Sequence, residues 1–311
     1  MKTILISGCA GFIGCNLIER LIINNKIIGI DNFSSSSEHK LLKFINNKNF
    51  KFIKSDINTL SSINDKIDII YNLACPASPP RYQNAPLFTL KTNFIGTMNL
   101  LDLAKKKSSI FIQASTSEVY GDPLEHPQNE NYFGNVTTMG PRSCYDEGKR
   151  VAETLCYEYR RNFNVETRVV RIFNTYGPYM DIDDGRVISN FLVNVIKNKP
   201  LEIYGDGSQT RSFCYIDDLV DGLIKASLID FNIPINLGND NEISLNNLAK
   251  ALKDTFKKIK INYKEGAKDD PKMRKPDINR AKDILNWSPN ISLDKGLSLT
   301  IDYFKSQILY E

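Results

Sequence analysis

A tyrosine and a lysine, Tyr145 and Lys149, lie four positions apart in the stretch SCYDEGKR, residues 143–150. On a helix, side chains four positions apart share a face, so the phenol and the ammonium group would be neighbours. A fixed cation beside a phenol lowers the pKa of the phenol, so that tyrosinate can act as a base near neutral pH. The same spacing also occurs on ordinary solvated helices, so the surrounding elements must decide between the two interpretations.

A glycine-rich turn near the N-terminus predicts a dinucleotide site. The apolar run TILISG is typical of a buried parallel strand, and Gly8, Gly11 and Gly14 follow it and open a helical pattern. Glycine lets the backbone approach a pyrophosphate, and a helix N-terminus attracts that anion. The next strand, KIIGID, ends at Asp31, whose carboxylate suits an adenosine ribose and repels a 2′-phosphate. A plain turn is the alternative, but the combination favours NAD binding.

Further alternating patterns predict an α/β fold, a doubly wound parallel (Rossmann) sheet. The runs NFKFIKSDI, IDIIYNLA and SIFIQASTSEVYG are buried strands, residues 87–106 form a long helix, and residues 165–174 are the last clear strand of the sheet. Ligands bind at the carboxyl ends of such strands. The residues at these ends are Asp56, Ile57, Ala74, Ser115 and Thr116.

The pattern changes to shorter units after residue 174. We expect helices within residues 187–197, 215–228, 244–256, 277–287 and 292–308, with Ser244 as an N-cap, and short strands at LEIYGDG and PINLGN. These units predict a smaller mixed α/β lobe that closes over the substrate. We therefore divide the chain into a dinucleotide-binding domain, 1–174, and a substrate-binding lobe, 175–311, with a soft boundary because the chain weaves between the two.

Composition excludes several function classes. In the 311 residues, with a net charge of +4, no basic tract is interleaved with aromatic residues, so we expect no nucleic-acid partner. Six scattered cysteines favour reduced thiols and a cytoplasmic location. With two histidines and no ligand spacing, we expect no metal. No signal peptide or long apolar segment precedes the first strand, so we expect no membrane partner.

Several motifs together resemble the extended short-chain dehydrogenase/reductase family of nucleotide-sugar enzymes. They are the glycine turn, the STSEVYG loop and the Tyr-x-x-x-Lys pair. Within that family, the stretches LACPASPPRYQNAP, GPRSCYDEGKRVAETL, RIFNTYGPYM, YGDGSQTRSFCYIDDLV and DDPKMRKPDI resemble those of UDP-glucuronate decarboxylases. The resemblance covers nearly the whole chain. It implies an NAD-dependent carboxy-lyase that converts UDP-glucuronate to UDP-xylose and carbon dioxide through a 4-keto sugar, with NAD recycled internally.

The resemblance also implies residue roles. Tyr145 would be the base, Lys149 its activator and ribose anchor, and Thr116 a hydrogen-bond partner of the reacting hydroxyl group. Glu118 would be the additional active-site carboxylate of the decarboxylases. The implied cofactor-binding residues are Gly8, Gly11, Phe12, Ile13, Gly14, Asp31, Asn32, Asp56, Ile57, Leu73, Ala74, Thr92, Ser115, Tyr145 and Lys149, with Asn93 on the same segment as Thr92. The implied substrate-binding residues are Ser117 and Arg211 at the substrate carboxylate, Asn174, Arg186, Val187 and Arg274 at the nucleotide diphosphate, and Tyr204 and Gln209.

Structural alternatives stay open for some of these residues. Glu118 could merely cap its loop, Arg211 could lie on the surface, and Arg274 could lie in a solvated loop. Tyr176 and Tyr204 could stack on uracil or pack in the core. Cys144 has no histidine partner in sequence, so we interpret it as a small buried residue rather than a nucleophile.

Rival functions share the first oxidation. A 4,6-dehydratase usually carries Asp-Glu after the threonine, where this chain has Ser117-Glu118, and a 4-epimerase needs no Glu118. A catalytically dead NAD(H) or sugar-nucleotide sensor is disfavoured because Thr116, Tyr145 and Lys149 are all present. Two stretches, GNVTTMGPRS and DNFSSSSEHK, depart from the decarboxylase pattern, and such departures could shift substrate preference.

Apolar helix faces predict self-association. Residues of the long helix form an apolar stripe of Leu87, Leu90, Phe94, Met98 and Leu101. A helix that flanks a parallel sheet needs only one apolar face, so a second one marks an interface. Since family members pair two such helices from each subunit, we expect a homodimer with a four-helix interface.

Overall fold

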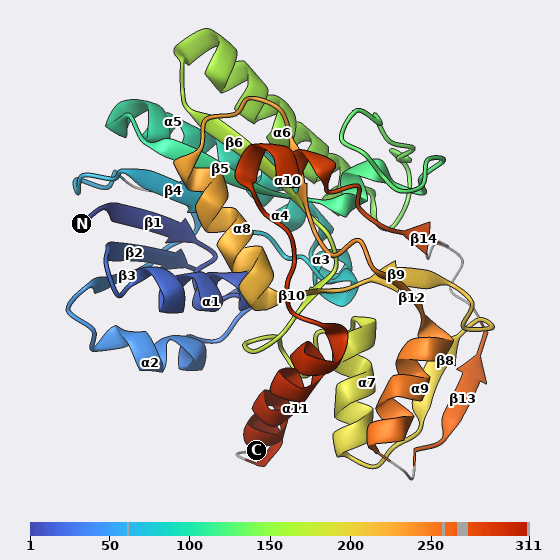
Figure 1. Cartoon of the computed structure of the whole chain (residues 1–311). Coiled ribbons are helices and arrows are strands. Elements are labelled where there is room, and N and C mark those ends of the chain that lie inside the picture. Colours follow the sequence, from blue (N-terminus) through green and yellow to red (C-terminus); the bar gives the residue numbers. More distant parts are fainter. Residues whose placement is uncertain (61, 257–258, 266–272, 310–311) are drawn as a thin grey trace.

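A seven-stranded parallel sheet forms the centre of the larger lobe (Figure 1). The computed structural model of the protein describes residues 1–60, 62–256, 259–265 and 273–309. The strand order is β11-β6-β5-β4-β1-β2-β3, and every neighbouring pair is parallel. The strands are β1 (Thr3–Ser7), β2 (Lys26–Asp31), β3 (Phe50–Lys54), β4 (Ile69–Asn72), β5 (Ile110–Thr116), β6 (Thr167–Ile172) and β11 (Ile235–Leu237). The predicted fold class, a doubly wound parallel sheet, is confirmed.

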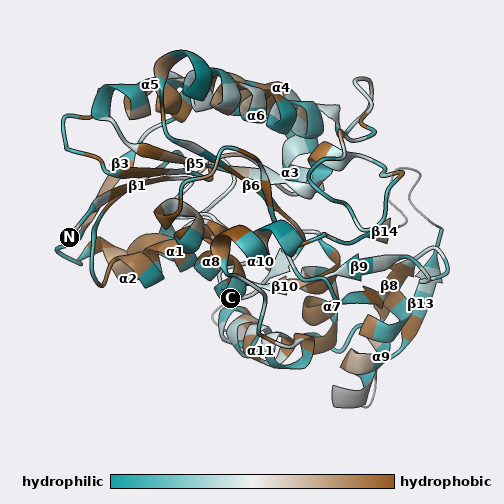
Figure 2. Cartoon of the chain, turned by 45° about the horizontal axis from the view of Figure 1, so that its top comes forward, coloured by the Kyte–Doolittle hydropathy of each residue, from teal (hydrophilic) through white to brown (hydrophobic). Residues whose placement is uncertain are grey.

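Helices cover both faces of this sheet (Figure 2). One layer consists of α4 (Pro86–Lys91), α5 (Thr97–Lys107) and α6 (Ser143–Phe163), and the opposite layer contains α1 (Phe12–Leu21) and α8 (Ile216–Leu228). The strands between the layers are rich in buried apolar residues, as expected of a sheet covered on both sides. Short helical pieces in the larger lobe are η1 (Glu38–Leu41), α2 (Leu42–Ile45), η2 (Ile57–Thr59), α3 (Pro79–Asn84) and η4 (Ser117–Tyr120).

The long helix predicted over residues 87–106 is continuous but contains a π-helical turn. Helix α4 passes through this turn, η3 (Thr92–Gly96), into α5. Such turns widen a helix locally and often occur at functional sites. The residues of the predicted apolar stripe differ in exposure. Leu101 is fully buried, whereas Leu87 and Phe94 are 72% and 47% exposed.

The strand predicted at residues 165–174 is confirmed as β6, but it is not the last strand of the sheet. Strand β11 pairs with β6 and adds a seventh strand, with Ile235 opposite Val170. Helix α8 also packs on the sheet, against β5 and β6. The second half of the chain therefore contributes a strand and a helix to the larger lobe. The division at residue 174 stays a prediction about where the chain first crosses between lobes.

The smaller lobe is mixed and is built on short sheets. Its helices α7 (Val187–Ile196), α9 (Leu245–Thr255) and α11 (Leu293–Leu309) agree with the predicted segments, as do α8 and α10 (Asn279–Leu285) near the sheet. Ser244 caps α9 as predicted, accepting a hydrogen bond from the amide of Asn247 (3.2 Å). The short strands are β7 (Thr175–Tyr176), β8 (Leu201–Tyr204), β9 (Thr210–Ser212), β10 (Cys214–Tyr215), β12 (Glu242–Ser244), β13 (Ile261–Lys264) and β14 (Met273–Arg274).

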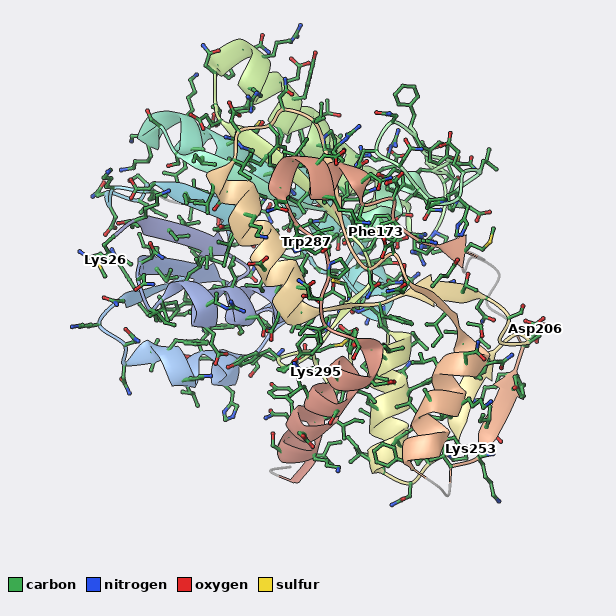
Figure 3. All side chains as sticks on the ribbon, viewed as in Figure 1. Lys26, Phe173, Asp206, Lys253, Trp287 and Lys295 are labelled. Carbon is green, nitrogen blue, oxygen red and sulfur yellow. The ribbon has the colours of Figure 1, made fainter. Side chains whose placement is uncertain are left out.

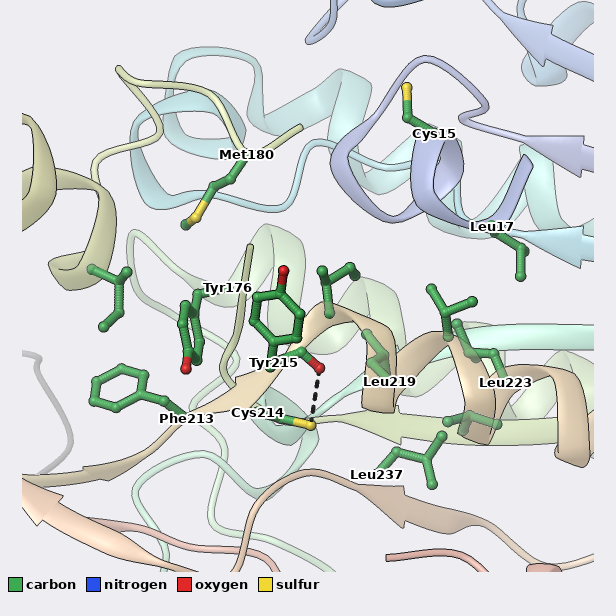
Figure 4. Close-up of a cluster of buried hydrophobic side chains, with 14 of the residues drawn as sticks. Cys15, Leu17, Tyr176, Met180, Phe213, Cys214, Tyr215, Leu219, Leu223 and Leu237 are labelled. Carbon is green, nitrogen blue, oxygen red and sulfur yellow. Dashed lines mark hydrogen bonds between the residues drawn. The ribbon is translucent and has the colours of Figure 1, made fainter. Parts of the chain in front are cut away.

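One hydrophobic core extends through both lobes (Figure 4). Tyr176 and Phe213 pack edge to face, with ring centroids 6.4 Å apart, and Tyr215 lies between this pair and Leu219 of α8. Trp287, next to α8 (Figure 3), is buried and donates from Nε1 to the carbonyl oxygen of Asp218 (2.9 Å). Because the core is shared, the two lobes are held in one arrangement around the space between them. None of the described helices is long and apolar enough to cross a membrane.

Candidate active site

Two adjoining cavities lie where the carboxyl ends of the sheet strands meet the smaller lobe. The larger has a volume of about 430 Å³ and the smaller of about 60 Å³. The predicted residues that line the larger one are Gly8, Gly11, Phe12, Ile13, Gly14, Leu73, Ser115, Thr116, Ser117, Glu118, Tyr145, Lys149, Asn174, Arg186, Val187, Tyr204, Gln209, Arg211 and Arg274. The smaller one is lined by Asp31, Asn32, Asp56, Ile57, Ala74 and Thr92, and shares Gly8, Gly11 and Leu73. The structure thus brings the predicted set together, while the individual roles stay predictions.

The glycine turn leaves room for a dinucleotide. Gly8 has a φ of +69°, and a Cβ there would lie 2.9 Å from the backbone of Ala74. A Cβ on Gly14 would lie 2.4 Å from the carbonyl oxygen of Gly8, so only glycine lets α1 pack this close. Helix α1 begins at Phe12, its N-cap Gly11 makes no side-chain hydrogen bond to it, and these residues line the larger cavity. The open helix start therefore fits a pyrophosphate.

Carboxylates and amides line the smaller cavity. Asp31, at the end of β2, accepts hydrogen bonds from the amides of Ala10 (2.9 Å) and Phe33 (2.8 Å). Asn32 donates to the carboxylate of Asp56 (3.1 Å). These fixed oxygens fit an adenosine ribose and repel a 2′-phosphate, so the residues present fit NAD.

Tyr145 and Lys149 lie on the first two turns of α6, in the larger cavity. The ammonium nitrogen of Lys149 donates to the carbonyl oxygen of Ala114 (2.8 Å) and lies 5.8 Å from the ring centroid of Tyr145. Tyr82, on α3, stacks on Tyr145 with centroids 5.0 Å apart and planes 9° apart. The two neighbours, Lys149 and Tyr82, fix the phenol between a cation and an aromatic wall.

The pKa of Tyr145 is shifted in the direction opposite to the prediction. Burial raises the pKa of the Tyr145 phenol well above its usual value, and burial also lowers the pKa of Lys149. Lys149 by itself therefore does not bring the phenol's pKa near neutral, and the prediction that Lys149 and the nicotinamide charge lower it together stays a prediction. Desolvation of the phenolate, together with the nearby Cys75, Glu118 and Asp146, outweighs the hydrogen bond with Thr116 that favours the phenolate.

Glu118 lies between two guanidinium groups. It belongs to η4, directly after β5, where the hydroxyl of Thr116 accepts a hydrogen bond from its amide (3.2 Å). Its Oε1 accepts from Nη1 of Arg274 (2.7 Å), and its Oε2 accepts from Nη2 of Arg142. Burial raises the pKa of Glu118, but Arg274 and Arg142 outweigh it and lower the pKa overall. The carboxylate therefore stays ionised, and its side chain does more than cap a loop.

Arg274 is buried rather than solvated. Beyond Glu118, it donates to the hydroxyl of Ser117 (3.0 Å) and the carbonyl oxygen of Gly121 (3.1 Å), and only 3% of the residue is exposed. The solvated-loop alternative is therefore wrong, although residues 269–272 of its motif lie outside the described residues. Its contact with a diphosphate stays a prediction.

The remaining predicted substrate-binding residues also line the larger cavity, and Arg211 is the register partner of Arg274 where β9 pairs with β14. Arg186 precedes α7 and binds the carboxylate of Asp184 (Nη2–Oδ1 3.0 Å), and Arg211 lies in β9 with only 8% exposed, so it is not a surface residue. Tyr204, at the end of β8, is 47% exposed and lines the cavity, whereas Tyr176 packs in the core. Tyr204 is thus available to stack on the uracil ring, and Tyr176 is not. Asn93 lines neither cavity. Its side-chain amide nitrogen donates to Sγ of Cys75 (3.1 Å).

Sequence reasoning missed an ionic cluster at the rim, which we call the clasp and define as Lys40, Arg81, Asp181 and Asp183. Asp181 accepts from Lys40 (2.5 Å) and from Arg81 (2.8 Å), and Arg81 also reaches Asp183 (3.4 Å). Arg81 donates as well to the carbonyl oxygen of Ser35, a residue that lines both cavities. The clasp therefore joins η1, α3 and the loop before α7 across the cofactor side of the pocket, and the Arg81–Ser35 contact adds the loop after β2. The acidic run DIDDG was its only sequence signal.

Comparisons with known proteins identify the family of the chain. Residues 5–300 match a family model described as GDP-mannose 4,6 dehydratase. UDP-glucuronic acid decarboxylase 1 of Arabidopsis thaliana is 49% identical over 310 residues, covering 99% of this chain and 71% of that protein. UDP-glucuronic acid decarboxylase 1 of Xenopus tropicalis is 46% identical over 312 residues, covering 100% and 74%. A crystal structure of the UDP-glucuronic acid 4-epimerase from Bacillus cereus, in complex with UDP-glucuronic acid and NAD, superposes with a TM-score of 0.89 at 31% identity, covering 98% of this chain and 99% of that one.

Proposed function

The chain belongs to the UDP-glucuronic acid decarboxylase family of extended short-chain dehydrogenases/reductases, and on that premise we propose that it converts UDP-glucuronate to UDP-xylose and carbon dioxide. The observation that carries the proposal is the arrangement around Glu118. An ionised carboxylate with a guanidinium group on each oxygen lies one residue beyond Ser117 and two beyond Thr116, in the cavity that also holds Tyr145 and Lys149. An enzyme that only oxidises and reduces carbon 4 has no need of this second charged group.

Tyr145 takes the proton from the hydroxyl group on carbon 4 of the sugar, and Thr116 orients that hydroxyl group. Bound NAD⁺ supplies the hydride acceptor and a positive charge in a site where burial otherwise raises the pKa of the phenol. Lys149, held by the carbonyl oxygen of Ala114, anchors the ribose and keeps its charge beneath Tyr145. The product of this step is a ketone at carbon 4.

The ketone makes the carboxylate on carbon 5 labile. The bond between carbon 5 and the carboxylate breaks, its electron pair enters the enolate, and carbon dioxide leaves. The protonated Tyr145 and the hydroxyl of Thr116 donate hydrogen bonds to the enolate oxygen at carbon 4. Glu118 holds Arg274 and Arg142 at the same end of the cavity. Carbon 5 then takes up a proton from solvent. As the hydride returns to carbon 4, Tyr145 gives its proton back to the oxygen there, so the turnover consumes one proton and would leave NAD⁺ unchanged.

Cationic side chains support binding of a substrate with three negative groups. Arg186 and Asn174 line the cavity where the uridine diphosphate would lie, and Arg211, beside Arg274 in the pairing of β9 with β14, would face the sugar carboxylate. Ser117 lies beside Glu118 and Arg274, at the end where the sugar carboxylate would lie.

One assay tests the function. The purified protein is incubated with NAD⁺ and UDP-glucuronate, and NMR follows the sugar nucleotides and carbon dioxide. We expect UDP-xylose and one equivalent of carbon dioxide. UDP-galacturonate without carbon dioxide would make the protein a 4-epimerase. A 4-keto-6-deoxy sugar formed from UDP-glucose would make it a dehydratase.

We also propose that two copies of the chain pair through α4, η3 and α6. Leu87 and Phe94 on one side, and Val151 and Tyr157 on α6, are between 40% and 72% exposed, and α6 packs against α4 and η3. These four side chains expose apolar surface on the helix layer that covers one face of the sheet. Two such surfaces form a four-helix interface when they meet about a two-fold axis.

A further inference from the structure

Arg142 joins the two elements that carry the residues proposed for catalysis. Its carbonyl oxygen accepts hydrogen bonds from the amides of Tyr145 (2.9 Å) and Asp146 (3.0 Å), so its backbone begins helix α6. Its guanidinium group binds Oε2 of Glu118, in η4. One residue therefore fixes both the start of the helix that carries the phenol and the position of the carboxylate.

Asp146 lies on the other side of that guanidinium group. Its Oδ2 is 3.9 Å from Nε of Arg142, and only 6% of the residue is exposed. Its second oxygen, Oδ1, is buried and has no hydrogen-bond partner in the part of the chain that the structure describes. A buried, half-paired carboxylate costs stability, because the interior solvates charge poorly. Packing alone would favour an uncharged side chain here, so the position needs a functional reason.

We propose that Arg142 and Asp146 are positioning residues for decarboxylation: Asp146 holds the guanidinium group of Arg142, and Arg142 holds the carboxylate of Glu118 beside Tyr145. This inference rests on the proposed function. Glu118 is gripped on Oε1 by Arg274 and on Oε2 by Arg142, so both oxygens are fixed. Without Arg142, one oxygen is released and the carboxylate can rotate about the remaining contact.

The oxidation step depends on different contacts. Lys149 is held by Ala114, and Tyr145 is packed against Tyr82; neither contact involves the Arg142 side chain. The backbone of Arg142, which begins α6, survives any side-chain substitution. A change at this side chain should therefore slow the loss of carbon dioxide and leave the reduction of bound NAD⁺ largely intact.

The decisive variant is Arg142→Gln. Stopped-flow absorbance of NADH reports the oxidation step, and carbon dioxide release reports decarboxylation. We expect kcat for carbon dioxide release to fall on the order of 100-fold, as displacement of a group by about 1 Å can cause. NADH formation and KM should change by no more than about three-fold, so NADH should accumulate. Arg142→Lys should recover part of the loss, because it keeps the charge without the two-sided fork.

A purely structural role predicts a different result. If the pair only fastened α6 to η4, NADH formation and carbon dioxide release would fall together with the melting temperature, and the proposal would be wrong. A rise in KM at constant kcat would also overturn it, since Arg142 would then bind substrate directly. Arg20→Gln, an exposed arginine on α1, is the matched control and should leave both steps unchanged.

Asp146→Asn tests the second contact and serves if Arg142→Gln fails to fold. The groups that face Asp146 are Arg142, Glu118 from η4, Arg274 from β14, Tyr82 from α3, and Cys144, Tyr145 and Glu147 from α6. Burial and the charge of Glu118 raise the pKa of Asp146 to about 7. Decarboxylation by the wild type should therefore rise as pH passes through about 7, where Asp146 ionises and grips Arg142. Asp146→Asn should stay at the lower rate and lack this rise; a variant that keeps it would contradict the proposal.

The wild type separates this inference from the proposed function. If the wild type releases no carbon dioxide from UDP-glucuronate, the proposed function fails. If the wild type does so and Arg142→Gln releases it equally fast, the proposed function stands and only the positioning role is wrong.

Discussion

Burial and reactivity make opposite demands on Tyr145. Its ring is enclosed by Tyr82 and by α6, and this enclosure raises the pKa of the phenol. Lys149, beneath it, is itself desolvated, and its own pKa is lowered. The phenol therefore needs a further positive charge to lose its proton at neutral pH, which couples its reactivity to occupancy of the dinucleotide site.

Tyr145→Phe removes the hydroxyl group of the proposed base but keeps the aromatic ring that stacks on Tyr82. We expect the rate of bound NAD⁺ reduction by UDP-glucuronate to fall on the order of 100- to 10,000-fold, the usual contribution of a general base. Calorimetric binding of UDP-glucuronate should persist. Tyr263→Phe, at an exposed phenol on β13, is the control. If Tyr145→Phe reduced NAD⁺ at the normal rate, another group would have to be the base.

The pKa of Asp146 also makes a prediction about stability. Folding raises this pKa from 3.8 to about 7, so between these pH values the folded protein holds a proton that the unfolded chain has lost. The contribution of Asp146 to the free energy of unfolding therefore falls as pH rises through that window. Since Asp146→Asn cannot titrate, its melting temperature relative to the wild type should increase from about pH 4 to about pH 7 and then level off. A difference that is constant with pH would mean that Asp146 is not perturbed.

At the scale of elements, the site depends on starts and ends of regular structure. Helix α1 starts at the glycine turn, α6 starts at Arg142, and β5 runs into η4 with Thr116 at the junction. Backbone groups without a partner inside the helix lie at these starts, and ligands bind where the carboxyl ends of parallel strands meet. The elements themselves are rigid, so small changes at their ends should change function more than fold.

Gly8→Ala tests the turn. Its φ of +69° strains any other residue, and the new Cβ would lie 2.9 Å from the backbone of Ala74. We expect loss of co-purifying NAD and a destabilisation of about 1 kcal/mol or more. The NAD content of the purified protein and its melting curve give the two readouts. Gly140→Ala is the control, because its Cβ meets its nearest neighbour at an ordinary 3.4 Å. Unchanged NAD content in Gly8→Ala would argue against NAD binding at the glycine turn.

Local signals were enough to predict most of these elements. Glycine spacing located the turn before α1, and hydrophobic periodicity located α6 and the helices of the smaller lobe. Strand β11 was missed as a sheet member because three residues carry no periodicity and its partner β6 lies far earlier in the chain. The contacts of Glu118 are similarly long-range: Arg142 is 24 positions away and Arg274 is 156 positions away. Motif resemblance identified the pocket residues, but only folding shows which side chains touch and how burial shifts the pKa of Tyr145.

At the scale of the whole molecule, exposed apolar surface and buried polar surface are separated. The buried charged groups of the site, such as Glu118 and Arg274, line the pocket, whereas Leu87, Phe94 and Tyr157 expose apolar surface on the outer helix layer. Because α6 has the buried Tyr145 on its inner side and the exposed Tyr157 on its outer side, pairing of two copies would stiffen the helix that carries the proposed base.

Phe94→Glu should break that pairing. Two charges would be buried at a two-fold interface without partners, so we expect a monomer by light scattering after size-exclusion chromatography, at concentrations where the wild type is a dimer. Phe133→Glu alters a residue that is 90% exposed but lies in a loop outside these helices, and it should remain dimeric. A wild type that is itself monomeric at every concentration would disprove the four-helix interface.

The clasp of Lys40, Arg81, Asp181 and Asp183 fastens three segments over the dinucleotide side of the pocket. Arg81→Gln removes two of its ion pairs, and we expect NAD to dissociate up to about ten-fold faster, since partly exposed pairs contribute at most about 1 kcal/mol each. After rapid dilution, a reporter dehydrogenase and its own substrate would reduce the released NAD⁺ to NADH, and the rise of NADH fluorescence would give the dissociation rate. Lys51→Gln, which breaks an exposed pair on β3, should change nothing. An unaltered dissociation rate for Arg81→Gln would show that the clasp does not retain the cofactor.

A reaction that returns its borrowed hydride within each turnover gains nothing from exchanging dinucleotide with the surroundings. A fastened rim would thus insulate the protein from the cell's balance of oxidised and reduced NAD, and sugar-nucleotide output would follow substrate supply even when respiration stalls.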